Sequence, residues 1–225
     1  MKLYSYWRSS SSWRVRIALG IKGMAHETIP INIAPGSEEH KSAAYAAIHP
    51  AMQVPVLVLK DTTGGHEHNI ALSQSVAILE LLEELYPDPP LLPKGPVLRA
   101  KVREVVEVIN SGIQPFQNTP IMRSVEQWTS PAQAKHWIAS QIAGGLHRVQ
   151  LLIEPQAQSH SFGGYCFGDS PTLADVFLIP QLYGARRYGA DLTGLDTLLA
   201  VERNCEMLPA FQRAHPDAQP DAPKG

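Results

Sequence analysis

The stretch MKLYSYWRSSSSWRVRIALGIKG, residues 1–23, contains the two elements with which the chain begins. MKLYSYW is short, apolar and aromatic, which is typical of a β-strand. Trp13, Ile17 and Ile21 then recur at four-residue steps, and Gly23 follows as a C-cap, so the spacing predicts a helix. Four consecutive serines, 9–12, separate the two elements, although one serine is enough to cap a helix.

The pattern continues through the next 64 residues or so as an alternation of strands and helices. The predicted elements are an edge strand at 26–33, a helix at 38–48, strands at 54–59 and 70–72, and a helix at 73–87. The two later strands are joined by a loop of hairpin length, so the sheet is expected to be mixed. Ser73 or Ser75 is expected to cap the last helix, with Glu80, Glu83 and Glu84 facing water.

A proline-rich connector ends this α/β region. YPDPPLLPKGP, residues 86–96, holds five prolines in eleven residues and cannot continue a helix. Beyond it the pattern is helical at 97–109, 132–154, 170–189 and 195–206, with Gly112 and Pro115 disturbing the chain after the first of these. Thr172 and Asp175 form a capping box, and the Pro-rich tail from 215 is expected to drape or fray.

The bulk composition excludes several classes of function. The 225 residues are 44% hydrophobic and 18% charged with a formal net charge of −2, which argues against broad attraction to nucleic acid or to anionic lipid. No secretory signal and no apolar run long enough to span a bilayer is apparent, so a cytoplasmic protein is expected. Cys166 and Cys205 lie far apart and form no metal-ligand spacing, so no metal site is expected.

The serine run has the chemistry of an anion site. A helix N-terminus leaves about four N–H groups unpaired and carries about half a positive charge. Arg8, Arg14 and Arg16 add cations around it. A serine nucleophile is disfavoured because no G-x-S-x-G motif is present and the nearest histidine in sequence is His26. The serines are better suited to donate hydrogen bonds to a thiolate carried by another molecule.

Several blocks of the chain together resemble the zeta-class glutathione transferases. They are YSYWRSSSSWRVRIALGIKG, QVPVL, LSQSVAILELLEELYP, GIQPFQN and GDSPTLADVFLIPQ, in order along nearly the whole chain. The resemblance implies an α/β thioredoxin-like domain with a mixed four-stranded sheet at 1–86, a Pro-rich linker at 87–96 and an all-α C-terminal domain at 97–225. It also implies glutathione as cosubstrate and a homodimer.

The activity implied by the resemblance is the glutathione-dependent cis–trans isomerisation of maleylacetoacetate to fumarylacetoacetate in tyrosine and phenylalanine breakdown. The glutathione thiolate adds to the alkene, the new single bond rotates, and elimination returns glutathione. Three alternatives stay open: a maleylpyruvate isomerase, a transferase or dehalogenase acting on small α-halo acids, and a glutathione-fold protein that only binds. Gln114 and Asn118 favour maleylacetoacetate, because maleylpyruvate isomerases are expected to carry histidine and arginine in that segment.

The resemblance also assigns site residues by position. Ser9 matches the serine that stabilises the thiolate, with Ser10 and Ser11 as further catalytic candidates, and Arg8 and Arg187 match a clamp for substrate carboxylates. The glutathione-binding candidates are Ser9, Ser10, Ser11, Ser12, Trp13, Arg14, His40, Gln53, Val54, Pro55, Gln74, Ser75, Gln114, Asn118 and Thr119. The resemblance places Gln114 and Asn118, with Thr119 beside them, on the substrate side.

Some of these assignments carry their own expectations. Pro55 is expected in the cis form, which would let the Val54 backbone pair with glutathione like an added strand. His40 stands where the family often has a glutamine contacting the glycyl end, and Gln74 and Ser75 match the pair that holds the γ-glutamyl carboxylate. Ser11 departs from the family, in which many members have cysteine, so this chain lacks that thiol. For Arg8 and Arg187, the alternative to binding a substrate carboxylate is an ion pair at the protein surface.

Overall fold

The computed structural model describes residues 1–61, 68–158 and 163–223, which form two compact units. The first unit contains residues 1–89 together with 209–225, and the second contains residues 90–208. The helical domain expected at 97–225 differs from this grouping, because helix α9 (Pro209–Ala214) packs against α1 of the first unit. Each unit is described by itself below.

The first unit is built on a mixed four-stranded sheet, as expected. Its strands are β1 (Lys2–Ser5), β2 (Glu27–Pro30), β3 (Val56–Asp61) and β4 (His68–Ser73), in the order β2-β1-β3-β4. β1 runs parallel to β2, with Leu3 opposite Thr28, and antiparallel to β3, with Leu3 opposite Leu57. β3 and β4 form the antiparallel hairpin, and β2 is an edge strand, as Pro30 indicated.

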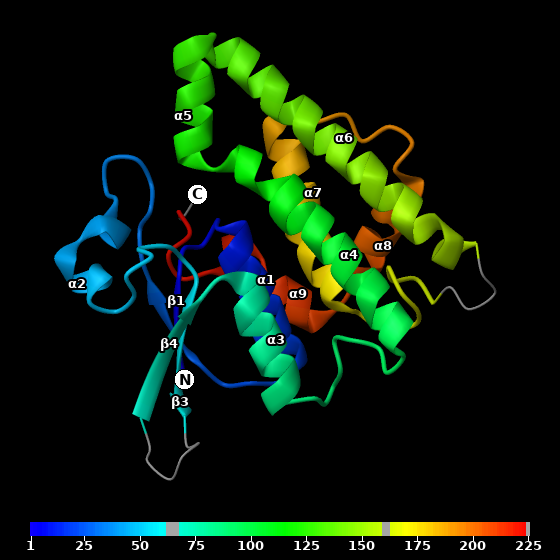
Figure 1. The fold of residues 1–225 in the computed structure, drawn as a ribbon, viewed down its shortest axis with the longest axis horizontal. Coiled ribbons are helices and arrows are strands. Elements are labelled where there is room, and N and C mark those ends of the chain that lie inside the picture. The colour runs from blue at the N-terminus through cyan, green and yellow to red at the C-terminus, as the bar shows by residue number, and fades with distance from the viewer. Residues whose placement is uncertain (62–67, 159–162, 224–225) are drawn as a thin grey trace. The chain divides into compact units, whose positions relative to one another are not determined.

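Two helices and the sheet enclose the core of the first unit. Helix α1 (Ser10–Ile21) contacts helix α3 (Ser75–Leu85), and Figure 1 shows the two side by side against the strands. The buried core residues come from β1, α1, β3 and α3: Leu3, Val15, Leu19, Leu57, Leu59, Ile78 and Leu82. Burial of these side chains stabilises the unit by about 1.5–3 kcal/mol each, before the entropy of ordering them is subtracted.

The far ends of these two helices are joined by a buried ion pair. Lys22 Nζ lies 2.5 Å from the Glu83 carboxylate and also donates to the carbonyls of Tyr86 and Pro89, at 2.7 and 3.0 Å. The expectation that Glu83 faces water is therefore wrong, since only 8% of this residue is exposed. The pair fixes the position at which the chain leaves α3.

The predicted helix at 38–48 is much reduced in the structure. It consists of a 3-10 turn, η1 (Glu39–Lys41), and a single helical turn, α2 (Ala43–Ala46), whose N-cap Ser42 accepts a hydrogen bond from Tyr45 N. Tyr45 is the only residue of these two elements that is buried. Helix-forming residues are therefore not sufficient here, because few of them gain burial to offset ordering.

The second unit is a bundle of helices. Its elements are α4 (Pro96–Gly112), the 3-10 turn η3 (Gln114–Gln117), α5 (Thr119–Trp128), α6 (Pro131–Ala157), α7 (Leu173–Tyr188) and α8 (Asp196–Glu206). α7 contacts α4, α6 and α8, and the residues that it buries include Val176, Phe177 and Leu178. Thr172 and Asp175 form the predicted capping box at its start. Together with the sheet unit, this bundle gives the expected fold class.

Candidate functional site

The serine run forms the beginning of helix α1. Ser9 is the N-cap: its Oγ accepts a hydrogen bond from Ser12 N at 3.2 Å, and its own N–H donates to the Tyr6 carbonyl at 3.0 Å. No acidic residue lies in the first turn. The unpaired N–H groups at this helix end therefore face no carboxylate from their own turn, which favours binding of an anion.

The capping bond leaves the Ser9 hydroxyl proton available. A serine hydroxyl has one donor and two acceptor positions, and the bond from Ser12 N uses one acceptor. Ser10 and Ser11 are partly exposed, whereas Ser12 is fully buried and its Oγ has no hydrogen-bond partner within the described residues. The four serines thus divide into a cap that can also donate, two partly exposed hydroxyls and one buried hydroxyl.

Arg14 points into the protein instead of lining the outer face of the turn. Its side chain is fully buried, and Nη1 donates to Ser75 Oγ at 3.2 Å. Burial lowers the pKa of the Arg14 guanidinium. Trp13 is also buried, with 3% exposed, and its ring meets that of His215 edge to face at 5.2 Å between centroids. Both residues support the helix start from within.

The segment before β3 brings together a second group of expected residues. The Val54–Pro55 peptide bond is cis, as expected, and lies just outside the β-ladders, which begin at Val56. The side chain of Gln53 accepts from Gln74 Nε2 at 2.9 Å, and its backbone carbonyl accepts from the Tyr45 hydroxyl at 2.8 Å. Gln53 and Gln74 are both exposed, so their polar groups are accessible.

Helix α3 begins beside this segment. Its N-cap is Gln74, so the expectation that Ser73 or Ser75 caps it is wrong. Ser75 is the first helical residue, and Gln74 has φ = 71°, a left-handed conformation that is uncommon outside glycine. This backbone turns the chain sharply from β4 into α3. This turn places the Gln74 side chain and the N-terminus of α3 next to Gln53.

Two further candidates lie near these elements in sequence. His40, in η1, is half-buried, and its Nδ1 is buried without a hydrogen-bond partner in the described part of the chain. Burial, followed by the charge of Lys41, lowers the pKa of His40, with Glu38 opposing the shift. The guanidinium of Arg8 lies over the Trp7 ring, 5.1 Å from its centroid.

The second unit holds the substrate-side candidates on η3 and the start of α5. Gln114 Nε2 donates to Asn118 Oδ1 at 2.9 Å, and Thr119 is the first residue of α5. The next glutamine of the turn, Gln117, donates through Nε2 to the buried Gln181 Oε1 at 3.0 Å. The disturbance expected from Gly112 and Pro115 is thus a defined turn that brings two amide side chains together.

Arg187 is exposed near the end of α7, and its guanidinium lies over the Tyr188 ring at 5.3 Å. Its neighbour Arg186 is instead engaged with Glu202, through two N···O contacts of 2.5 Å. Surface ion pairing therefore describes Arg186. The geometry leaves Arg187 facing solvent, where a guanidinium can bind a carboxylate.

Sequence reasoning missed several residues that support these candidates. Tyr45 holds Gln53, and Gln181 holds Gln117. Gly184 allows α7 to approach η3, because a Cβ there would lie 2.6 Å from Gln117 Oε1. A glycine inside an otherwise helical pattern was the signal for this close approach. For Tyr45 and Gln181 the sequence offers no comparable signal.

Two properties of the described residues concern other kinds of site. No helix in residues 1–61, 68–158 and 163–223 has the length and hydrophobicity required to cross a membrane. Over the same ranges, no group of three or more His, Cys, Asp or Glu side chains is arranged to hold a metal ion.

Comparison with known proteins gives the relationship directly. Residues 8–85 match the N-terminal domain of glutathione S-transferases. Maleylacetoacetate isomerase of Pseudomonas aeruginosa is 41% identical over 224 residues, covering 99% of both chains. A maleylpyruvate isomerase, described as a bacterial zeta-class glutathione S-transferase, is 39% identical and superposes with a TM-score of 0.88 over 99% of this chain and 100% of its own.

This chain belongs to the zeta-class glutathione transferases. A solved member is the maleylacetoacetate isomerase of Anaeromyxobacter dehalogenans, with glutathione in its active site: 44% identity, a TM-score of 0.85, and coverage of 99% of this chain and 97% of that one. A second crystal structure of the Anaeromyxobacter protein holds dicarboxyethyl glutathione and citrate in the active site, with 42% identity, a TM-score of 0.83, and coverage of 99% of this chain and 93% of that one.

Proposed function

We propose that this chain is a glutathione-dependent isomerase that converts maleylacetoacetate to fumarylacetoacetate. The observation that carries the proposal is the start of α1, where Ser9 caps the helix and keeps a hydroxyl proton to donate. The family membership supports the same activity, because the zeta-class relatives from Pseudomonas aeruginosa and Anaeromyxobacter dehalogenans are maleylacetoacetate isomerases.

The residues of the first unit fit glutathione by their unsatisfied polar groups. Ser12 Oγ and His40 Nδ1 are both buried without a partner among the described residues, and both belong to the expected glutathione set. We assign the γ-glutamyl carboxylate to the N-terminus of α3 at Ser75, with Gln74 and Gln53 beside it. The Val54 backbone would hold the cysteinyl part and His40 the glycyl end.

The burial of Arg14 changes its assigned role. Since the guanidinium donates to Ser75 Oγ from a fully buried position, Arg14 supports the γ-glutamyl subsite through Ser75 and does not need to contact glutathione. Trp13 similarly supports the helix start by packing. The direct contacts near the sulfur are left to Ser9, Ser10 and Ser11.

The chemistry of the reaction places one main demand on the chain. When bound, glutathione supplies a thiolate that adds reversibly to the alkene, so that a single bond can rotate. The pKa of a thiol, about 8.5, must fall by roughly two units for the thiol to be mostly ionised at pH 7, which corresponds to about 2.7 kcal/mol. The Ser9 hydroxyl can provide about 1.5–3 kcal/mol as a charge-assisted hydrogen bond, and the helix N-terminus about 0.3–1 kcal/mol.

The proposed substrate is acidic, and the second unit offers groups that suit it. Arg187 is exposed and can bind a carboxylate in bidentate fashion, and Arg8 is the other arginine that we propose for binding a substrate carboxylate. Gln114 and Asn118 would hold the polar oxygens of the substrate as a hydrogen-bonded pair. Dicarboxyethyl glutathione and citrate, bound by the Anaeromyxobacter protein, carry several carboxylates, which supports an acidic substrate here.

The direct test is the rate of isomerisation of maleylacetone, an analogue of maleylacetoacetate, with and without glutathione. The proposal predicts turnover that depends on glutathione and leaves its concentration unchanged. Turnover that proceeds equally well without glutathione, or no turnover at all, would contradict it. Consumption of glutathione with an α-halo acid and none of the isomerisation would favour the transferase or dehalogenase alternative, and binding alone would favour a non-catalytic protein.

Maleylpyruvate isomerisation is the second candidate. It is favoured by the 39% identity to a zeta-class maleylpyruvate isomerase that superposes over 99% of this chain. The amide pair of Gln114 and Asn118 favours maleylacetoacetate instead. Measuring kcat/KM for maleylacetone and maleylpyruvate on one preparation decides between them, and the preferred substrate should exceed the other by about tenfold or more.

We also propose that the chain acts in the cytoplasm as a homodimer, following the family resemblance. Light scattering at micromolar concentration should give twice the mass of the chain. A mass equal to one chain over the whole concentration range would contradict the dimer without affecting the proposed chemistry.

A further inference from the structure

The C-terminal segment contacts the turn that leads into the serine run. Residues 214–221, here named the C-terminal strap, begin at the last residue of helix α9 and belong to the first unit. Trp7 N donates to Asp221 Oδ2 at 2.9 Å, across 214 positions of sequence. Trp7 lies two residues before Ser9, the N-cap of α1. The strap therefore reaches the turn that positions Ser9, the residue proposed to donate a hydrogen bond to the thiolate.

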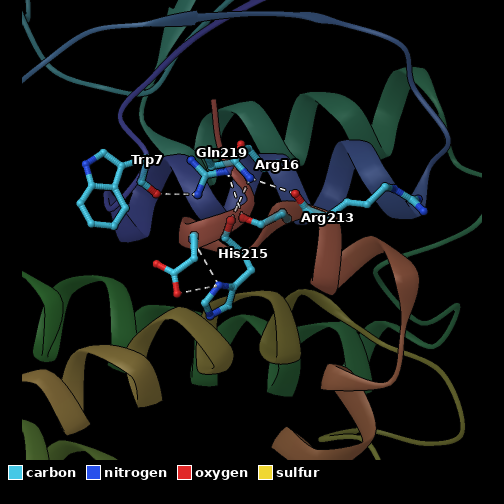
Figure 2. Close-up of polar contacts among 7 residues, drawn as sticks. Trp7, Arg16, Arg213, His215 and Gln219 are labelled. Atoms are coloured by element: carbon cyan, nitrogen blue, oxygen red, sulfur yellow. Dashed lines mark hydrogen bonds and ion pairs between the residues drawn. The ribbon is translucent and has the colours of Figure 1, made fainter. Parts of the chain in front are cut away.

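Arg16 fastens the other side of the same turn. It is buried in α1, and its guanidinium donates through Nη2 to the Trp7 carbonyl at 2.9 Å and through Nη1 to the Tyr6 carbonyl at 3.3 Å and Ser5 Oγ at 2.9 Å. Its Nε donates to the Ala214 carbonyl at 3.1 Å. Figure 2 shows Arg16 between Trp7 and the strap. Trp7 is therefore held at its N–H by Asp221 and at its C=O by Arg16.

The strap is ordered by contacts of its own. Gln219 Nε2 donates to the carbonyls of Arg213 and His215 (Figure 2), and each donor–acceptor distance is 2.9 Å. The ring of His215 packs edge to face against the buried Trp13 ring, which follows the serine run. These contacts give the segment a defined path over the start of α1, so of the two expectations for the tail, that it drapes or that it frays, the first describes it.

Charge adds to this arrangement. Burial lowers the pKa of Arg16 to about 10, and the Asp221 carboxylate opposes that shift. Asp221 therefore stabilises the charged guanidinium whose N–H groups hold the Tyr6 and Trp7 carbonyls. The Tyr6 carbonyl also accepts from Ser9 N, so the network continues directly to the N-cap.

We propose that Asp221 and Arg16 are positioning residues for glutathione activation, and that the strap holds the 6–9 turn so that the Ser9 hydroxyl meets the sulfur. This inference rests on the proposed role of Ser9. A charge-assisted hydrogen bond weakens steeply as its geometry departs from the optimum, so loosening of the turn should raise the pKa of the bound thiol. Mere packing of a chain end would change stability and leave that pKa unaltered.

The test uses Asp221→Ala and Asp221→Asn in the full chain, with Asp217→Ala as the matched control. Asp217 lies on the same strap, but its side chain is 73% exposed, and its Oδ2 lies 3.6 Å from His215 Nδ1. The pKa of glutathione bound to each variant is measured from the ultraviolet absorbance of its thiolate. Hydrogen exchange of the Ser9–Ser12 amides is measured in the glutathione-free protein.

Asp221→Ala is expected to raise the pKa of the bound thiol by about 0.5–1 unit and to speed exchange at these amides about threefold or more. Asp221→Asn should give about half the pKa rise, since its amide oxygen still accepts from Trp7 N but its charge is gone. Asp217→Ala should change neither quantity. If Asp221→Ala fails to fold, Asp221→Asn gives the deciding measurement.

Ser9→Ala, measured in parallel, separates this inference from the proposed function. If Ser9→Ala raises the thiol pKa and both Asp221 variants leave it within about 0.2 unit of the parent, the strap only packs and the inference is overturned. If Ser9→Ala also leaves the thiol pKa unchanged, the proposed role of Ser9 fails, and the inference fails with it.

Discussion

Replacing Ser9 by alanine tests the proposed chemistry at its source. The Ser9 hydroxyl has two roles in the account: it accepts from Ser12 N at 3.2 Å, and it donates to the sulfur of glutathione. Loss of the cap should reduce the free energy of unfolding by about 0.5–2 kcal/mol. Loss of the donor removes about 1.5–3 kcal/mol of thiolate stabilisation, which corresponds to a rise of about 1–2 units in the thiol pKa.

The two effects are separated by a second capping serine. Ser130 caps α6 with the same kind of bond, its Oγ accepting from Gln133 N at 3.3 Å, and lies in the other unit. Ser130→Ala should lose a similar free energy of unfolding, about 0.5–2 kcal/mol, with the thiol pKa unchanged. Ser9→Ala should in addition lower kcat by about 10- to 100-fold near neutral pH, because less of the bound glutathione is ionised.

The assay combines thiolate absorbance of bound glutathione, turnover of maleylacetone and denaturant unfolding. Ser9→Thr, which keeps a hydroxyl, should retain most of the parent activity. The reasoning would be refuted if Ser9→Ala lowered stability as Ser130→Ala does and left both the thiol pKa and kcat unchanged. Another group, with Ser10 or Ser11 as the first candidates, would then hold the thiolate.

Three further predictions concern other parts of the structure. Gly184→Ala places a Cβ 2.6 Å from Gln117 Oε1 and should displace the η3 turn. We expect the KM for maleylacetone to rise about fivefold while the affinity for glutathione stays constant. The control is Gly144→Ala, whose Cβ would meet Arg148 Nη1 at 3.9 Å, an ordinary van der Waals contact. Glu83→Gln leaves the Lys22 ammonium buried without its charge partner and should lower the free energy of unfolding by about 3 kcal/mol in urea titrations, whereas the exposed Glu84→Gln should cost little. His40, whose pKa burial lowers, should titrate by NMR with a midpoint below its ordinary value of about 6.5; since the unfolded chain protonates first as the pH falls, His40 favours the folded state above about pH 6.5 and loses that contribution in more acidic solution. A midpoint above 6.5 would contradict the burial of His40.

The elements that the sequence predicts well are those in which local pattern and burial agree. Trp13 and Ile17 lie four residues apart in α1 and are both buried, so the periodicity predicts the helix, although residues 12–19 are all buried and the period does not single out an inner face. The helix at 38–48 lacks that agreement, because its alanine-rich pattern favours a helix while little besides Tyr45 is buried. Propensity alone therefore overestimates its length.

The direction in which a side chain points is harder to predict from the sequence than the helix to which its residue belongs. The sequence places Arg14 in the glutathione-facing turn, but only the structure shows its guanidinium buried against Ser75. Adjacent residues on a helix point in directions about 100° apart, so the position of a residue in the sequence does not by itself give the partner that its side chain meets. The same limitation applies to Arg186 and Arg187, which are neighbours in sequence and have different partners.

The tail is the part that local reasoning could least predict. Its residues are polar and Pro-rich and show no period of strand or helix, which is typical of a loose end. The structure orders the tail through distant partners, with Asp221 bonded to Trp7 and the Ala214 carbonyl to Arg16. Contacts across roughly two hundred positions leave no local signature in the sequence.

The most direct test of the account is a crystal structure of this protein with glutathione bound. The account predicts the sulfur at the N-terminus of α1, within about 3.5 Å of Ser9 Oγ, and the γ-glutamyl carboxylate at the start of α3 beside Ser75. A sulfur directed away from residues 9–12, or glutathione bound elsewhere, would contradict it.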